Sequence, residues 1–297
     1  MRVLVVFCHK NMRARWAAEA LLPYLRERSV GCEVIDLDEI PACSEVLEGN
    51  KRLLLDGRLS GPFCLMVVLG GDGSILRASR LAVLLGLPIL GMNYGHLGFL
   101  SNPEGVSWQE LIQSALEGEC QTELLPTLEI ELHSGLRNGL AAARPQRMFA
   151  LNDVAVNRAA STNVMEYAIR VSGCELATMR GDGVVVASST GSTAYALSAG
   201  GPLLAPGNRG LVIVPLAPHT LSSRAVVTGQ DDCVEIDLDP FGEGAGEGLS
   251  IQVDGELLSL ERPADKLYVR GGPASVELLR IEGESFYKRA SAVFFKQ

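Results

Sequence analysis

One stretch in the first third of the chain limits its fold more than any other. An apolar, β-branched run at 65–69 ends in Gly70-Gly71-Asp72-Gly73-Ser74, and apolar residues then recur with helical spacing up to Leu85. This pattern predicts a buried strand, a glycine-rich turn and a helix that ends before Pro88. A helix N-terminus offers backbone N–H groups and a positive dipole end to an anion, and glycines let a ligand approach the main chain. We therefore expect an anion site at this turn.

Asp72 is unusual in such a turn, because a carboxylate repels the phosphate that the turn would hold. It can accept a hydrogen bond from a ligand hydroxyl, or bind a metal beside the phosphate. It can also be an ordinary helix N-cap, a role that Ser74 could share. The turn by itself leaves these interpretations open.

The first hundred residues alternate between apolar runs and helical patterns. A helical pattern covers 11–28. The apolar runs are 2–7, 33–37, 65–69 and 88–94. This alternation predicts a parallel sheet covered by helices, as in a Rossmann-like α/β domain, and ligands bind at the carboxyl ends of such strands. The glycine-rich turn after residue 69 follows one of these ends.

A second glycine-rich turn, residues 93–100, follows the last of these strands. Two such turns at one edge of a sheet are what a shared ligand cleft requires. His96 and Phe99 in this turn can contact a ligand, although a structural histidine and a phenylalanine in the core are at least as common. A connecting helix is expected over 101–119.

From residue 122 onward, apolar residues recur at every second position. The alternating segments include 128–132, 167–171, 234–238, 251–253 and 267–269. Short alternating strands with glycine-rich turns predict a mostly antiparallel β domain. The tail, with apolar stretches at 276–281 and 285–295, is apolar enough to pack back onto the first domain. We therefore predict an α/β domain made of residues 1–103 and the tail 276–297, and a β domain over 104–275.

Two polar segments of the predicted β domain have the composition of a ligand site. Asn152 and Asp153 adjoin inside an apolar strand, where both residue types are disfavoured. They indicate either an edge strand or bulge, or a pair of side chains that grips ligand hydroxyls. The second segment, 188–195, combines small hydroxyl residues with Tyr195 and follows Asp182. Small residues let a flat base lie close and hydroxyls read its edges, so this loop is a candidate nucleotide pocket, although such loops also begin helices.

Composition argues against several classes of function. The 297 residues are 47% hydrophobic and 21% charged, as in a globular protein, and a net charge of −9 without a dense Lys/Arg cluster argues against a nucleic-acid partner. The seven cysteines lie far apart and the four histidines do not cluster with them, so neither a zinc site nor a disulfide framework is indicated. No apolar stretch has the length of a signal-peptide core or a membrane span. We expect a cytoplasmic protein with no membrane partner.

Five segments of the chain together resemble the NAD kinase family. They are, in order, Gly70–Ser74, Gly91–Leu100, Leu151–Asp153, Asp182–Pro202 and Pro218–Arg224. Five ordered motifs form a highly specific match. The resemblance implies an α/β domain followed by an antiparallel β-sandwich domain with the site between them, and assembly as a homodimer or homotetramer.

By this resemblance the activity is ATP-dependent phosphorylation of the adenosine ribose 2′-hydroxyl of NAD, which gives NADP. NAD and ATP are then the substrates, with polyphosphate as an alternative donor. A divalent metal, usually Mg²⁺, is the implied cofactor, and no residue is assigned as its ligand. Asp72 matches the family's catalytic carboxylate, which contacts the attacking hydroxyl. The other residues that match substrate-binding positions are Gly73, Arg77, Asn152, Asp153, Arg180, Asp182, Thr193, Ala194, Tyr195, Ala196, Leu197, Ser198 and Gln252.

The residue types suit this chemistry. A ribose hydroxyl is a very weak acid and an aspartate at a helix N-terminus is a weak base, so Asp72 cannot remove the proton beforehand. Bond formation to the nucleophile is late in phosphoryl transfer, and most of the rate acceleration comes from positioning the reacting groups. We therefore predict that Asp72 orients the hydroxyl and accepts its proton as the transfer completes.

The same residues argue against other functions. A phosphofructokinase, which also uses a Gly-Gly-Asp-Gly turn, would be expected to carry a second glycine-rich loop near the N-terminus, where this chain has Phe7–Met12 without glycine. A diacylglycerol or sphingosine kinase would not be expected to carry the loop Thr190–Tyr195 in this form. A non-catalytic sensor of NAD or NADP has little need for Asp72. A dehydrogenase is disfavoured, because no Gly-x-Gly-x-x-Gly opens the helix after the first strand.

Overall fold

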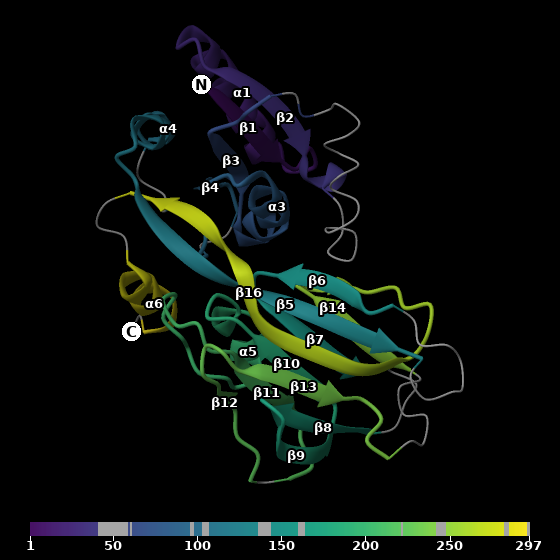
Figure 1. Ribbon diagram of the computed structural model, residues 1–297. Helices are drawn as coiled ribbons and strands as arrows, with labels where there is room; N and C mark the ends of the chain where they lie inside the picture. The colour runs from purple at the N-terminus through teal and green to yellow at the C-terminus, as the bar shows by residue number, and fades with distance from the viewer. Residues whose placement is uncertain are drawn as a thin grey trace. The chain divides into compact units, whose positions relative to one another are not determined.

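The computed structural model describes residues 1–40, 59, 61–95, 98–102, 107–135, 144–159, 164–220, 222–241, 248–281 and 285–295. These residues form two compact units (Figure 1). The first unit holds the described residues up to Leu125 and again from Ser275 onward, and the second holds those from Pro126 to Ala274. His96 lies outside the described residues.

The first unit is built on a parallel sheet. Its strands, in spatial order, are β2 (Gly31–Asp36), β1 (Arg2–Phe7), β3 (Leu65–Gly70), β4 (Ile89–Asn93) and the end of β16 (Ala264–Arg280). Its helical segments are α1 (Met12–Glu27), the 3-10 turn η1 (Leu37–Glu39), α3 (Asp72–Leu85), α4 (Trp108–Glu117) and α6 (Phe286–Phe294). This is an α/β domain, as the predicted fold class has it, and the end of β16 and α6 belong to it. It extends to Leu125 and so includes α4, beyond the predicted boundary at residue 103.

The predicted strand–turn–helix element is present. Every residue of β3 is buried, as expected for a central strand of a parallel sheet. Helix α3 starts after Gly71 and ends at Gly86, which has the left-handed conformation (φ 62°) that favours glycine at a helix C-terminus. Helix α4 is shorter than the expected helix over 101–119. It starts at a capping box in which Ser107 and Glu110 bond each other's backbone N–H groups, and it ends at Gly118.

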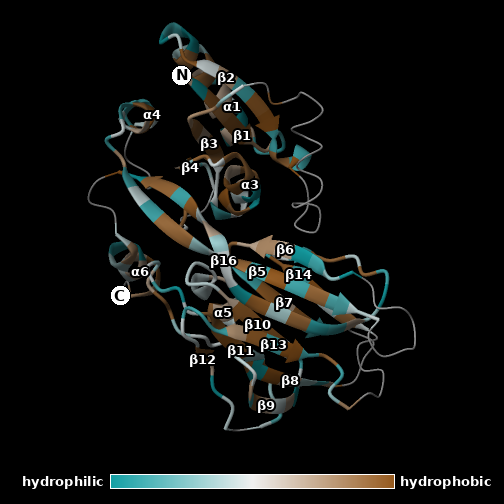
Figure 2. Ribbon diagram, viewed as in Figure 1, coloured by the Kyte–Doolittle hydropathy of each residue, from teal (hydrophilic) through white to brown (hydrophobic). Residues whose placement is uncertain are grey.

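The second unit is an antiparallel β-sandwich. One sheet has the order β12 (Val226–Val227), β11 (Val212–Leu216), β10 (Gly183–Ala187), β7 (Asp153–Arg158), β14 (Leu249–Val253) and β15 (Glu256–Leu257). The other contains the first part of β16 with β13 (Cys233–Asp237), β8 (Met165–Val171) and β9 (Cys174–Gly181), and the pair β5 (Gln121–Ser134) and β6 (Gln146–Ala150). A large cluster of buried side chains from both sheets forms the main core, and a smaller one includes Val185 and Val212. Hydrophobic residues are prominent along the central strands in Figure 2. The predicted fold class is therefore confirmed.

Strand β16 is longer than expected. The sequence indicates an alternating segment at 267–269 and an apolar stretch of the tail at 276–281, and the structure joins both in one continuous strand over Ala264–Arg280. The glycine-rich segment between them stays extended because Gly272 has no side chain where β5 approaches. A Cβ there would overlap the hydroxyl of Thr127, which donates to the carbonyl oxygen of Ala274 (2.5 Å). In the described part of the chain, no helix combines the length and apolarity needed to span a membrane.

Candidate active site

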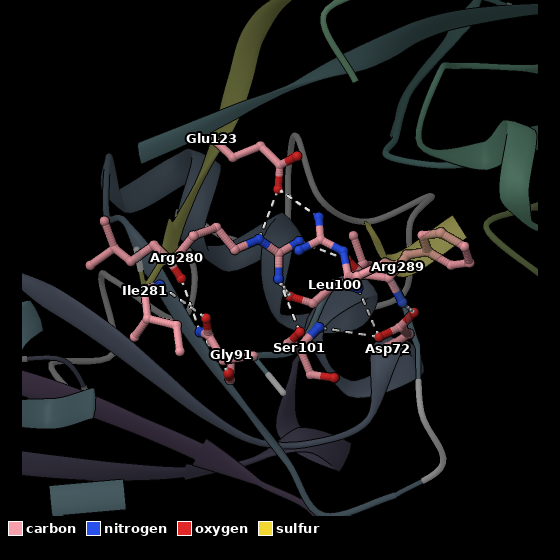
Figure 3. Close-up of polar contacts among 11 residues, drawn as sticks. Asp72, Gly91, Leu100, Ser101, Glu123, Arg280, Ile281 and Arg289 are labelled. Atoms are coloured by element: carbon pink, nitrogen blue, oxygen red, sulfur yellow. Dashed lines mark hydrogen bonds and ion pairs between the residues drawn. The ribbon is translucent and has the colours of Figure 1, made fainter. Parts of the chain in front are cut away.

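Asp72 is the first residue of α3, but its side chain does not cap that helix. The N-cap is Gly71, and no side-chain cap bond exists there among the described residues. The carboxylate instead accepts hydrogen bonds from three successive backbone N–H groups, those of Phe99 (2.6 Å), Leu100 (3.0 Å) and Ser101 (3.3 Å) (Figure 3). The alternative that Asp72 or Ser74 is an ordinary helix cap is therefore wrong. The two glycine-rich turns of the first unit are joined through this carboxylate.

The carboxylate of Asp72 retains one acceptor position. Oδ1 accepts the bonds from Leu100 and Ser101, and Oδ2 accepts the bond from Phe99. Two carboxylate oxygens have about four lone-pair positions, so the backbone donors use three and leave one on Oδ2. Gly98 allows this approach, because a Cβ at residue 98 would overlap the carboxylate of Asp72. Asp72 is half-buried, so a ligand hydroxyl can reach the remaining position.

The two other predicted residues of α3 differ in their surroundings. Gly73 is exposed, and a Cβ there would meet no atom of the described residues within 4 Å. Arg77 points toward η1, where it contacts the carboxylate of Asp38 (3.3 Å) and the carbonyl oxygen of Ile40 (3.4 Å). Lys10 binds the same carboxylate (2.7 Å) and is the main cause of the lowered pKa of Asp38. Arg77 thus belongs to a small charged cluster at the end of β2.

In the second unit, Asn152 and Asp153 lie where β7 begins, against the turn that follows β14. The carboxylate of Asp254 in that turn accepts the backbone N–H groups of Leu151 (3.0 Å), Asn152 (2.7 Å) and Asp153 (3.3 Å). Asp153 is 5% exposed, and burial, followed by the charge of Asp254, raises its pKa to about 7. The side-chain oxygen of Asn152 is buried and has no hydrogen-bond partner among the described residues. An orphaned buried oxygen of this kind is suited to a ligand donor.

The serine- and threonine-rich loop after β10 uses most of its hydroxyls internally. Ser188 donates to the carbonyl oxygen of Leu151 (2.5 Å), Ser192 to that of Ser189 (2.6 Å) and Thr193 to that of Thr190 (2.9 Å). These three hydroxyls thus donate within the fold and can meet a ligand only as acceptors, and their part in reading base edges stays a prediction. The hydroxyl of Thr190 is the exception, since it is buried without a partner in the described chain.

The loop is pressed against the Asn152 segment, and a glycine permits the contact. A Cβ on Gly191 would overlap the carbonyl oxygen of Asn152, and the N–H of Ser188 donates to that oxygen (2.8 Å). The unpartnered oxygens of Asn152 and Thr190 therefore belong to two segments that the fold holds together.

The short helix α5 (Tyr195–Ser198) follows this loop. Tyr195 is 39% exposed and its hydroxyl bonds Asn157 Oδ1 (3.1 Å), whereas Ala196 is buried in the core. The remaining predicted residues near α5 and on β14 are partly or fully exposed: Thr193, Ala194, Leu197, Ser198 and Gln252. An exposed aromatic face beside partly open small residues is compatible with a stacked base.

Arg180 and Asp182 each form an ion pair on the second unit. Arg180 contacts Glu166 (2.8 Å) across β8 and β9, and Asp182 contacts Arg158 (2.5 Å). Both acid–base pairs are partly exposed, so either residue can exchange its partner for a ligand group at small cost. Contacts of these residues with a ligand stay predictions.

Two residues that hold the candidate site together, Asp254 and Arg280, were not predicted from the sequence. Asp254 stands before Gly255 after an alternating strand, which is a common turn signal. Nothing in the local sequence indicates that it accepts hydrogen bonds from the Asn152 segment. Arg280 donates to the carbonyl oxygens of Phe99, Leu100 and Ser101, which lie about 180 residues earlier in the chain. No sequence signal indicates a contact over such a separation.

The described residues contain no group of three or more His, Cys, Asp or Glu side chains that could hold a metal ion. The donor set at Asp72 is a single carboxylate that already accepts backbone donors. This is not a protein cage for a resident metal. It is compatible with Mg²⁺ that reaches a site bound to substrate phosphates, which is a common way for this ion to bind.

Family models match most of the chain. The ATP-NAD kinase N-terminal domain matches residues 10–120 and the ATP-NAD kinase C-terminal domain matches residues 151–281. An NAD kinase of Polaromonas naphthalenivorans is 36% identical over 286 residues, which cover 96% of this chain and 93% of that protein. An NAD kinase of Cellvibrio japonicus is 33% identical over 281 residues, covering 94% and 90%.

Solved structures share the fold. A yeast NADH kinase complexed with NADH has a TM-score of 0.78 at 20% identity, and the match covers 99% of this chain and 87% of that one. An NAD kinase from Archaeoglobus fulgidus in complex with ATP has a TM-score of 0.70 at 23% identity, covering 99% and 98%. Together with the two family models and the sequence relatives, the Gly-Gly-Asp-Gly turn and the Asn152–Asp153 segment lead to one conclusion: the chain belongs to the ATP-NAD kinase family.

Proposed function

We propose that this kinase transfers the terminal phosphoryl group of ATP to the 2′-hydroxyl of the adenosine ribose of NAD, which gives NADP and ADP. The activity, phosphorylation of NAD with ATP as donor, follows from membership in the ATP-NAD kinase family. The observation that supports the atomic assignment is the Asp72 carboxylate, which backbone donors hold in one orientation with one acceptor position left on Oδ2.

Asp72 would act by accepting the hydrogen bond of the attacking hydroxyl. The bond that forms joins the 2′-oxygen to the γ-phosphorus, and the bond that breaks joins that phosphorus to the bridging oxygen of ADP. The hydroxyl proton passes to Oδ2 as the transfer completes. Because the transition state is loose, most of the rate acceleration comes from holding the hydroxyl in line with the γ-phosphorus. A carboxylate that is already oriented before substrate binds loses little freedom in doing so.

The start of α3 would bind the triphosphate of ATP. Gly71 and Gly73 carry no side chain that could block the phosphates. The N–H groups of Asp72 and Gly73 precede the first hydrogen bond of α3, which the N–H of Ser74 donates to the carbonyl oxygen of Gly71 (2.9 Å). These donors and the positive end of the helix dipole favour negative charge. Mg²⁺ would arrive with the triphosphate and offset its charge, and the chain's own residues would hold the phosphates and the hydroxyl.

The second unit would supply the contacts that select NAD. The unpartnered oxygens of Asn152 and Thr190 can accept hydrogen bonds from ribose hydroxyls or from an amino group of the base. The exposed ring of Tyr195 offers a face for the adenine. The other residues of the second unit that we propose to contact NAD are Arg180, Asp182 and Gln252. By the family resemblance we also expect a homodimer or homotetramer, and by the scattered cysteines a cytoplasmic protein.

The test is NADP formation from NAD, ATP and Mg²⁺ by the wild type and by Asp72→Asn, with NAD binding measured in parallel. The substitution keeps the size of the side chain but removes its charge and its ability to take up the proton, and its NH₂ group would replace one of the two oxygens that accept the backbone N–H groups. We expect turnover by the wild type, a loss of several orders of magnitude in the variant, and NAD binding largely retained.

Asp232→Asn is the matched control, because Asp232 also accepts a backbone N–H, that of Gly229 (2.7 Å), but lies on a surface turn. It should retain wild-type turnover. Undiminished turnover by Asp72→Asn would remove Asp72 from the mechanism. A folded wild type that binds NAD without turnover, with ATP and with polyphosphate, would favour a sensor.

A further inference from the structure

We propose that Arg280 is a positioning residue for Asp72, which it orients through the peptide groups of residues 99–101. The inference rests on the proposed role of Asp72 in phosphoryl transfer. It assigns part of that role to the C-terminal tail of the chain, about 200 residues after the Gly-Gly-Asp-Gly turn.

The guanidinium of Arg280 binds the back of the loop that holds Asp72. Nη2 donates to the carbonyl oxygen of Phe99 (2.6 Å), and Nη1 donates to those of Leu100 (2.8 Å) and Ser101 (3.0 Å). Nε donates to Oε2 of Glu123 (2.8 Å). Arg280 is 3% exposed, so these bonds form away from water. Figure 3 shows the guanidinium and the Asp72 carboxylate directed at the same short segment of backbone.

Two peptide groups connect the two side chains directly. In the peptide between Phe99 and Leu100, the carbonyl accepts from Arg280 and the N–H donates to Asp72 Oδ1. In the peptide between Leu100 and Ser101, the carbonyl again accepts from Arg280 and the N–H donates to the same oxygen. A hydrogen bond to the carbonyl polarises a peptide and strengthens the bond made by its N–H. Arg280 therefore acts on the donors that orient the carboxylate.

The geometry requires arginine in particular. A planar guanidinium presents five N–H donors in a fixed fork, which lets one side chain bond three successive carbonyls and a carboxylate at once. A lysine ammonium has three donors on a flexible stem and keeps the positive charge without the fork. Arg280→Lys is thus a substitution that separates positioning from charge.

The tail holds the loop at further points. Arg289 of α6 shares Glu123 with Arg280 (3.5 Å), so two guanidinium groups face one carboxylate and leave a net positive charge behind the loop. The ring of Phe99 lies against those of Phe286 and Phe294 on α6 (centroid distances of 5.9 and 5.6 Å).

Asn102 extends this attachment to the backbone of β16. Its amide group donates to the carbonyl oxygen of Leu279 (3.0 Å), and its side-chain oxygen accepts the N–H of Ile281 (3.4 Å). Because the loop is attached at all these points, loss of the Arg280 fork should shift the donors to Asp72 without releasing the loop.

The experiment compares kcat and KM for Arg280→Lys and Arg280→Met with the wild type, with thermal unfolding as a check on folding. A displacement of the reacting group by about 1 Å costs about 100-fold in rate. We expect kcat of Arg280→Lys to fall about 10- to 100-fold, with KM for NAD and for ATP changed less than about 3-fold. Arg270→Lys is the control, since Arg270 also forms a two-pronged contact, with Glu129 (3.0 and 3.0 Å), in the second unit. It should leave kcat unchanged.

The decisive measurement repeats Arg280→Lys in the Asp72→Asn background. If Arg280 acts through Asp72, the second substitution should lower the residual kcat less than about 3-fold, because the group that it positions is already lost. An equal fold-loss in both backgrounds would show a general structural role and overturn the inference. So would wild-type kcat in Arg280→Lys.

Glu123→Gln keeps the inference testable if both Arg280 variants fail to fold. It weakens the anchor of Arg280 while leaving the guanidinium in place. We expect a smaller kcat loss, about 3- to 10-fold, which again should vanish in the Asp72→Asn background. A loss that persists there would overturn the inference. Failure of the proposed function is distinguishable, since it would appear as absence of NADP formation by the wild type.

Discussion

Asp153 and Asp254 share one buried site in the second unit. The N–H of Asp254 donates to the carbonyl oxygen of Asp153 (2.9 Å), and Oδ1 of Asp254 accepts the N–H of Asp153 (3.3 Å). Both residues are less than 10% exposed, at 5% and 8%. Asp254 has three backbone donors for its charge, whereas Asp153 is desolvated beside that charge. The pKa of Asp153 is therefore raised, to about 7, by burial first and by Asp254 second.

This raised pKa makes stability depend on pH. In the unfolded chain Asp153 ionises near its ordinary pKa of 3.8, but in the folded protein it keeps its proton up to about 7. The folded state binds more protons in this window, so the contribution of Asp153 lowers the free energy of unfolding as pH rises from about 4 to about 7. Asp153→Asn removes the titration. The free energy of unfolding of Asp153→Asn relative to wild type should therefore rise across this window, by up to about 4 kcal/mol at about pH 8.

Chemical denaturation at a series of pH values checks this prediction. Asp232→Asn provides a control of opposite sign, because bonds from the Ser172 hydroxyl and then from the Gly229 N–H lower the pKa of Asp232. Asp232 stabilises the fold above its ordinary pKa, and this contribution is lost as pH falls through the lowered value. A stability difference between Asp153→Asn and wild type that stays constant with pH would contradict the shift.

Asp254→Asn should weaken the Asn152 segment. An amide group can present only one oxygen to the three N–H groups of Leu151, Asn152 and Asp153, and its NH₂ would face a donor. We expect a loss of about 1–3 kcal/mol in the free energy of unfolding and a raised KM for NAD. Unfolding curves and steady-state kinetics measure both effects. Unchanged KM in a folded variant would show that this segment does not contact NAD.

Gly98→Ala should disable Asp72 by steric means alone. A Cβ at this position would overlap the carboxylate of Asp72, so either the loop or the aspartate must move. We expect kcat for NADP formation to fall at least about 10-fold, because the Asp72 carboxylate would be displaced from the backbone N–H groups that orient it. Gly207→Ala is the control, because a Cβ there meets no atom of the described residues within 4 Å. Equal kcat in the two variants would argue against the close contact.

Two tyrosines of the second unit should respond differently to substitution. Tyr195 is 39% exposed, so Tyr195→Ala should raise KM for NAD while changing stability by less than about 1 kcal/mol. Tyr167 is fully buried and its hydroxyl donates to the carbonyl oxygen of Gly183 (2.8 Å). Tyr167→Phe should cost about 1–2 kcal/mol of stability and leave KM unchanged. The opposite pattern, measured by kinetics and thermal unfolding, would remove Tyr195 from the binding site.

Elements made by local interactions were predictable from the sequence. The run before Gly70 reads as a buried strand because every side chain is apolar, and Gly86 and Pro88 mark the end of the following helix. Predictions were incomplete where tertiary contacts set the extent of an element. The alternating pattern at 267–269 does not indicate a strand as long as Ala264–Arg280, in which Gly272 leaves room for Thr127 of β5.

The fold class, the family and the residue types of the site follow from the amino-acid sequence, because hydrophobic periodicity and short motifs are local properties of a chain. The hydrogen-bond partners of Asp72 do not, because they depend on how distant segments pack. A carboxylate before an apolar helix reads as a cap, yet its donors come from Phe99–Ser101, nearly thirty residues away, and those peptides are held by Arg280, about 180 residues farther on. Hydrogen bonds over such separations form only when the folded sheet brings β4 and β16 side by side. The carboxylate is oriented by neighbours that no local pattern contains.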